Sequence, residues 1–166
     1  MTSSSLIRHP SFTAFALQIL LAYEWISGGI EKMTQGRFVS EIEKTLGRFE
    51  SGNPHGWYVR SILRIAKNAP EIFGQLVQWG ELFVGIGLIA AILWYGFGRD
   101  RQQSPWTRFI AIPALLGGMF MNINFYYAAG WTNPSTGGLN MLMFWAQLIL
   151  ILFWIHSRDE KAVRTK

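Results

Sequence analysis

Four long apolar runs divide the chain. They cover about residues 12–30, 72–97, 109–130 and 139–155. Each approaches the roughly 20 residues that a helix needs to cross a hydrocarbon core about 30 Å thick. A soluble domain of 166 residues rarely needs four such runs. The pattern therefore predicts an all-α fold, a four-helix transmembrane bundle, with residues 1–166 in a single membrane domain.

The segment of about residues 33–70, between the first two runs, has a different pattern. Its apolar residues recur at helical spacing on both sides of a turn, SGNP: Phe38, Ile42, Leu46 and Phe49 before it, and Trp57, Ile62 and Ile65 after it. Polar residues fill the positions between them. This spacing predicts two short amphipathic helices that lie on the membrane surface and are joined at the turn.

Charged residues make up only 15% of the chain, against about 25% in soluble domains. Basic residues near membrane helices mark the cytoplasmic side. They occur at Arg8, at residues 99–108 and at residues 158–166, and they are absent from residues 131–138. We therefore expect a multi-pass protein of a prokaryotic inner membrane, with both termini in the cytoplasm. The net charge of +5 then reflects topology, and we expect no nucleic-acid partner.

The same topology places residues 33–70 outside the cytoplasm, although this segment is also basic. It carries Arg37, Lys44, Arg48, Arg60, Arg64 and Lys67. Attraction to lipid headgroups explains these charges, and so does an electropositive cover that draws in an anionic substrate. Both interpretations stay open at this point.

The chain has no cysteine. This excludes cysteine-ligated iron–sulfur clusters and thiolate catalysis by the chain itself. The three histidines show no metal-ligand spacing, so we predict neither a metal site nor an intrinsic cofactor. Any redox function would have to use an external electron carrier.

Several polar residues interrupt the apolar runs, and we expect them at similar depth in the outer half of the membrane. In the second run, Gly74, Gln78, Glu81 and Gly85 follow the spacing of one helical face. In the first run, we assign one face to Glu24, Gly28, Glu31 and Lys32. We predict that Glu81 faces the interior and shares a polar layer with Glu24, Asn122 or Asn124, with Lys32 as its nearest cation. The alternative is that these residues only join the helices together.

Four short motifs resemble the DoxX/DoxD family of membrane proteins. They are Gly29-x-x-Lys32, then Asn53-Pro54 with Trp57-Tyr58, then GELFVG at residues 80–85, and NINF at residues 122–125. The resemblance extends over about 120 residues, from Ala22 to about Leu150.

The resemblance implies an activity as well as a fold. In this family, a DoxD-like subunit works with a smaller partner as a thiosulfate:quinone oxidoreductase. Here it would imply Glu81 and Glu24 as proton donors, and Gln78, Asn122 and Asn124 near a bound quinone. Lys32 and Arg37 would attract the anionic substrate. The alternative is a non-catalytic subunit that packs against a larger respiratory or photosynthetic membrane complex.

Overall fold

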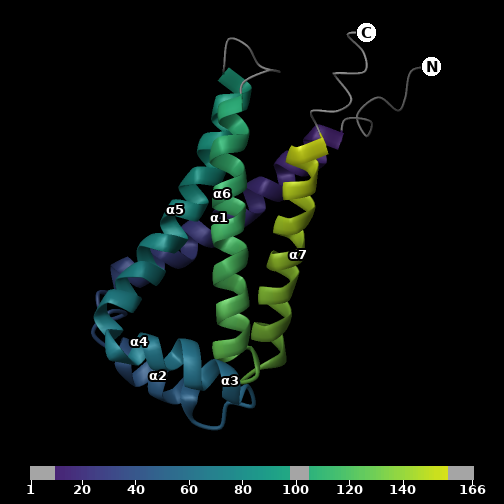
Figure 1. Ribbon diagram of the computed structural model, residues 1–166. Coiled ribbons are helices and arrows are strands. Elements are labelled where there is room, and N and C mark those ends of the chain that lie inside the picture. The colour runs from purple at the N-terminus through teal and green to yellow at the C-terminus, as the bar shows by residue number, and fades with distance from the viewer. Residues whose placement is uncertain (1–9, 98–104, 157–166) are drawn as a thin grey trace, which may run out of the picture.

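The computed structural model describes residues 10–97 and 105–156. Within them, the fold is all-α and four helices are long and apolar enough to cross a membrane. They are α1 (Pro10–Gln35), α5 (Pro70–Phe97), α6 (Pro105–Phe125) and α7 (Pro134–His156). The predicted four-helix bundle is therefore confirmed, and the chain is a multi-pass membrane protein (Figure 1).

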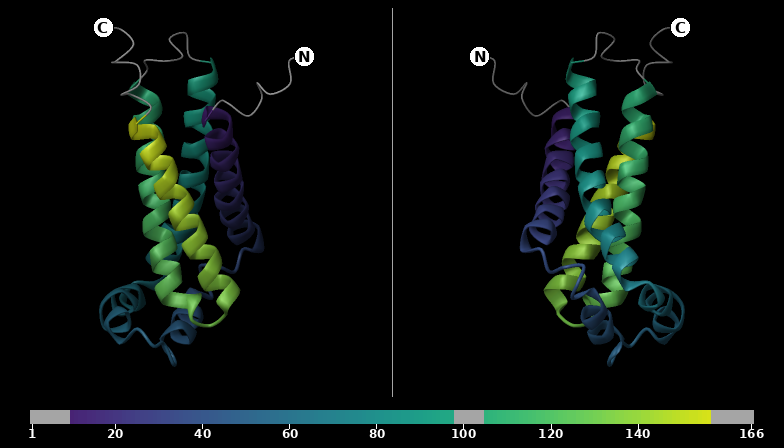
Figure 2. Two further views of the ribbon diagram at one scale, coloured as in Figure 1. Left: turned by 90° about the vertical axis from the view of Figure 1, so that its right-hand side faces the viewer. Right: turned by 90° about the vertical axis from the view of Figure 1, so that its left-hand side faces the viewer.

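The four long helices pack in the order α1, α5, α6, α7, with a smaller contact that closes the ring between α1 and α7. The start of α1, the end of α5, the start of α6 and the end of α7 lie at one end of the bundle (Figures 1 and 2). Arg8, residues 99–104 and residues 158–166, which the topology prediction uses, lie outside the described residues. Which end faces the cytoplasm therefore stays a prediction.

Local sequence signals set the helix ends. Pro70 and Pro134 each occupy the first position of a long helix, where the missing N–H costs nothing. The side-chain oxygen of Asn133 accepts a hydrogen bond from the Ser135 amide at 2.8 Å and caps the start of α7. Gly36 follows α1 with φ +64°, a conformation that glycine adopts without strain.

The segment between α1 and α5 folds into short helices that cross the other end of the bundle (Figure 1). They are α2 (Ile42–Glu50), α3 (Gly56–Tyr58), a π-helix η1 (Val59–Leu63) and α4 (Arg64–Asn68). We call residues 42–68 the cover segment. The two predicted helical stretches on either side of the SGNP turn are therefore confirmed, and Gly52 in that turn has φ +82°.

The predicted apolar face of the cover segment is buried against the bundle before the turn and only in part after it. Ile42 and Leu46 are buried, as the spacing predicts. After the turn, the fully buried residues are Tyr58, Leu63 and Ala66, whereas Trp57 and Ile65 are exposed. The reason is the π-helix at residues 59–63, whose wider turns place residues five apart on one face. The residues buried against the bundle after the turn are therefore Tyr58, Leu63 and Ala66, and the membrane contact of Trp57 and Ile65 stays a prediction.

Candidate functional site

An ion pair joins α1 to α5 near the end of the bundle that the cover segment crosses. The Lys32 Nζ atom lies 2.7 Å from Oε2 of Glu81. The Glu81 side chain is 4% exposed and that of Lys32 is 26% exposed, so the lysine is the member that reaches the surface. Lys32 also lies over the ring of Phe38, 5.5 Å from its centroid. Glu81 thus faces the interior with Lys32 as its partner, as predicted.

The predicted stripe on α5 packs against α1 and the start of the cover segment. A Cβ atom on Gly74 would lie 3.4 to 3.5 Å from Val39 and Ile42. A Cβ atom on Gly85 would lie only 2.5 Å from Ile26 of α1. Gln78, on the same stripe, is half-buried. The glycines therefore allow the close helix approach that brings Glu81 within reach of Lys32.

Gly28 provides the space that the ion pair occupies. A Cβ atom at this position would lie 3.1 Å from Glu81 Oε2 and 3.7 Å from Lys32 Nζ. The Gly28 carbonyl also accepts a hydrogen bond from Lys32 at 3.4 Å. Removing one member of a buried ion pair leaves an uncompensated charge, which is costly in an apolar environment. The pair and its glycine therefore act as one structural unit.

Glu24 does not share this site, and its predicted inward orientation was wrong. Its side chain is exposed on the outside of α1. The buried face of α1 instead contains Gln18, Ala22 and Trp25, and consecutive helical residues point about 100° apart. Glu24 precedes Trp25 and therefore points away from the core. It also lies eight residues before Lys32, about 12 Å further along the helix.

Asn122 is buried in the bundle but belongs to a different contact. Its side-chain amide donates to Oε1 of Gln147 at 3.0 Å and links α6 to α7. Gly118 makes room for this link, because a Cβ atom there would lie 2.3 Å from Gln147 Nε2 and 3.2 Å from Trp25 Nε1. Within the described residues, neither of these two buried N–H groups has a hydrogen-bond acceptor. No hydrogen bond joins Asn122 to Glu81 in the described part of the chain.

Asn124 holds the cover segment against α6. The buried Tyr58 hydroxyl donates toward the Asn124 backbone carbonyl at 3.1 Å and lies 3.2 Å from its side-chain oxygen. The Asn124 amide donates to Phe120 within its own helix. Burial raises the pKa of Tyr58 to about 12, because the phenolate would lose its hydration. Asn124 therefore joins two parts of the fold and lies apart from Glu81.

Asn53 makes a second link between the cover segment and α6. Its amide donates to the Tyr127 carbonyl at 3.0 Å, in the π-helix η2 (Tyr126–Gly130) that continues α6. Its side-chain oxygen accepts from the His55 amide at 2.8 Å. The aromatic rings of Trp57 and Tyr127 meet edge to face beside it. The Asn-Pro…Trp-Tyr motif is thus explained by packing.

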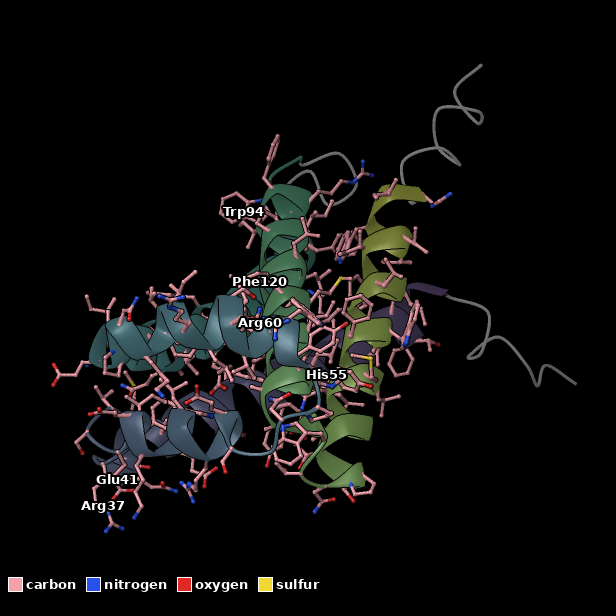
Figure 3. The ribbon with its side chains drawn as sticks, turned by 60° about the horizontal axis from the view of Figure 1, so that its bottom comes forward. Arg37, Glu41, His55, Arg60, Trp94 and Phe120 are labelled. Carbon is pink, nitrogen blue, oxygen red and sulfur yellow. The ribbon has the colours of Figure 1, made fainter. Side chains whose placement is uncertain are left out.

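Arg37 is exposed and lies beside Glu41 at the far edge of the structure, pointing away from the bundle (Figure 3). The joint action of Lys32 and Arg37 on one anion stays a prediction. The basic residues of the cover segment itself are also exposed: Lys44, Arg48, Arg60, Arg64 and Lys67. Lys67 forms an ion pair with Glu50. Among the described residues, the basic side chains of the cover segment thus form an exposed surface and make no ion pair with Glu81.

Sequence reasoning missed a polar contact deeper in the bundle. Gln18 is fully buried and donates to the Leu88 carbonyl at 2.9 Å. Its side-chain oxygen accepts from the indole N–H of Trp154 at 2.9 Å. These two hydrogen bonds join α1, α5 and α7, and they give the Gln18 amide, the Leu88 carbonyl and the Trp154 indole N–H a partner each. The spacing of Gln18 with Ala22 and Trp25 is the signal that could have revealed the buried face of α1.

Two hollows lie on the outer side of α5 and share Leu76, Gly80 and Phe83. One has a volume of about 570 Å³ between α5 and α6 and is bordered by Gly87 and Gly117 among others. The other, of about 580 Å³, extends toward Glu71, Gln75 and Trp79. Neither is lined by Glu81, whose side chain instead contacts Lys32 of α1.

No cluster of three or more His, Asp or Glu side chains occurs among residues 10–97 and 105–156. The chemistry of the site is therefore that of a carboxyl group paired with an ammonium group. It can exchange a proton or bind a polar group between α1 and α5. Comparison of the chain with protein-family models, curated proteins and solved structures finds no match.

Proposed function

We propose that the chain is the membrane subunit of a quinone-linked oxidoreductase, similar to the DoxD-like subunit of thiosulfate:quinone oxidoreductase. The observation that supports this proposal is the Lys32–Glu81 pair. An ionisable side chain that faces the interior of a membrane bundle commonly marks a ligand or proton path. In this proposal Glu81 exchanges a proton and Lys32 connects it to the outer surface.

The quinone would occupy the hollow between α5 and α6. This hollow is apolar and open to the lipid side, as a prenylated quinone requires. Gly80 lines it, and Glu81 is the next residue, so the hollow and the ion pair lie on two sides of the same turn of α5. Gly80 presents backbone and no side chain to the hollow. The proposal places electron acceptance in this hollow and proton supply at Glu81.

The topology is part of the same proposal. We propose that the chain lies in a prokaryotic inner membrane with the cover segment outside and both termini in the cytoplasm. The exposed basic residues of the cover segment would then meet an anionic donor such as thiosulfate at the outer surface. The donor-oxidising step would belong to a partner subunit, because this chain carries no cysteine.

The test is to measure the quinone that remains with the chain after purification in mild detergent, by solvent extraction and mass spectrometry. Glu81→Gln keeps the size and most of the hydrogen bonding but removes the ionisable proton. We expect this variant to assemble, to keep its quinone and to lose quinone reduction when the donor-oxidising partner is present. Glu43→Gln, an exposed change in α2, is the matched control and should behave as the wild type.

A second candidate is a non-catalytic subunit of a larger membrane complex. It is favoured by one observation, that neither hollow is lined by Glu81. In this case Glu81 would join helices, Glu81→Gln would behave as the wild type, and the purified chain would hold no quinone. Recovery of the chain only within a large cofactor-bearing assembly would support this second candidate.

A further inference from the structure

The outward face of α1 carries polar groups in a membrane-spanning helix. Glu24 and Glu31 are exposed, Tyr23 is 66% exposed, and Ser27 lies half-buried between them. Glu24, Ser27 and Glu31 are three to four positions apart and so form one face of the helix, and Tyr23 lies beside it, four positions before Ser27. Figure 2 shows α1 at the edge of the bundle, with one side turned away from the other long helices. This face is therefore available to another molecule.

Glu24 is the residue on this face whose surroundings are least explained. It lies near the middle of α1, a helix of 26 residues that is long enough to cross a membrane. Within the described residues, its carboxyl group makes no hydrogen bond and no ion pair. A carboxyl group at the centre of a membrane helix normally faces protein, water or a cation. The described residues supply Glu24 with no cation and no hydrogen-bond donor.

The outward faces of the other three spans differ from that of α1. Most of their exposed large residues are apolar or aromatic, as contact with lipid requires: Ile72, Leu76, Phe83 and Ile86 on α5, Phe109, Leu116 and Phe120 on α6, and Leu142, Trp145, Ile149 and Leu152 on α7. The α1 span also has the lowest hydropathy of the four. The exposed polar side chains of α5, Glu71 and Gln75, lie in its first two turns, so Glu24 is the exposed carboxyl group near the middle of a span within the described residues.

We propose that this face of α1 binds a transmembrane helix of a different protein, which places a lysine or arginine side chain opposite Glu24. A basic group at that depth would neutralise the carboxylate and remove both charges from lipid. Ser27 leaves room for the partner to approach, as small residues do at membrane helix contacts. The proposal does not depend on quinone binding.

A second copy of this chain fits the face less well. Two copies in the same membrane orientation are related by an axis along the membrane normal, so the same α1 face would contribute from each. Glu24 would then meet Glu24 of the other copy, and two carboxylates at close range repel each other. Lys32, the basic residue at the end of α1, is already paired with Glu81. Charge complementarity therefore favours a basic partner helix.

The test uses the full chain in phosphatidylcholine vesicles. Because the chain has no cysteine, Ser51→Cys in the exposed turn can carry a single fluorescent donor. The probes are acceptor-labelled Leu/Ala transmembrane peptides that differ only at the central residue, which is Lys, Leu or Glu. We expect energy transfer to report about tenfold tighter association with the Lys peptide than with the Leu peptide, the size of one polar contact between membrane helices.

Substitutions assign the effect to Glu24. Glu24→Leu should remove the preference for the Lys peptide, and Glu24→Lys should transfer it to the Glu peptide. Glu41→Leu, an exposed acidic residue at the edge of the structure (Figure 3), is the matched control and should keep the preference. Equal association of the wild type with the Lys and Leu peptides would overturn the proposal. Disulfide-linked dimers of a Ser27→Cys chain in the same vesicles would also overturn it, because a second copy would then cover the face.

Discussion

Two glutamates in membrane-spanning helices have opposite surroundings. Glu81 on α5 is almost fully buried and lies 2.7 Å from Lys32. Glu24 on α1 is exposed and has no ion pair within the described residues. Residue type is the same in both cases, so the difference comes from the helix face and from the neighbour that the fold provides. A glutamate in an apolar run therefore indicates an unusual site, and the helix face on which it lies decides whether that site is buried or exposed.

The two faces also differ in their packing. On the inner side, Gly28 and Gly85 bring α1 and α5 so close that added Cβ atoms would contact Glu81 Oε2 and Ile26. On the outer side, Glu24 points away from any other helix of the chain. The inner glutamate is thus part of a rigid contact, whereas the outer one is open to another protein. The following experiments test this contrast, beginning with the largest expected effect.

Lys32→Met should destabilise the chain most. It would leave the buried Glu81 carboxylate without its cation, a change that typically costs about 3–5 kcal/mol in the free energy of unfolding. The measurement is an SDS titration of the purified chain followed by far-UV circular dichroism. The double variant Lys32→Met/Glu81→Met should recover most of the loss. Wild-type stability of Lys32→Met would show that the ion pair is unimportant and would remove the contrast between the two glutamates.

Glu24→Leu should not destabilise the isolated chain and should instead favour its insertion into the membrane. Removing an exposed carboxyl group from the middle of α1 should favour membrane insertion of this helix by about 2.5 kcal/mol. The measurement is the inserted fraction of the full-length chain, with a glycosylation reporter in the turn at residues 51–54. The unfolding free energy should not decrease. A loss of stability comparable to that of Lys32→Met would mean that Glu24 is also held inside the protein.

Gly85→Ala should separate the packing of the inner face from its charge. The new methyl group would lie 2.5 Å from Ile26 and 3.0 Å from the Ala22 carbonyl oxygen, so the helices must shift apart. We expect a loss of about 1–3 kcal/mol in the SDS titration. Gly138→Ala is the control, because a Cβ atom there meets nothing within 4 Å. Equal stability of both variants would argue against close packing of α1 on α5.

Tyr58→Phe should have the smallest effect, about 1 kcal/mol, through loss of the hydrogen bond to Asn124. Its pH dependence is more informative. The pKa of Tyr58 is raised from its ordinary 10.0 to about 12 in the folded chain, so the unfolded form loses its proton first. The stabilisation is complete below pH 10 and is lost as the pH rises toward 12. Hydrogen exchange of the cover segment should show this decline in the wild type and a smaller one in Tyr58→Phe.

Much of the fold follows from the sequence alone. The four apolar runs predict the four long helices, and the spacing of Ile42 and Leu46 predicts the buried face of α2. These features depend on the length of each apolar run and on its local periodicity, and both can be read from the sequence without knowing how the helices pack. The inward orientation of Glu81 also follows, because Gly74 and Gly85 mark the same face of α5.

Other features were decided only by the tertiary structure. The rotation of α1 depends on which residues α5 and α7 can accommodate, and burial of Gln18, Ala22 and Trp25 turned Glu24 outward. The π-helix after Tyr58 changed the buried face of the cover segment. The polar residues expected in one layer form separate contacts: Glu81 pairs with Lys32, Asn122 with Gln147, and Asn124 with Tyr58. Periodicity defines the faces of a helix, but only packing against its neighbours determines which face is buried and which partner each polar group meets.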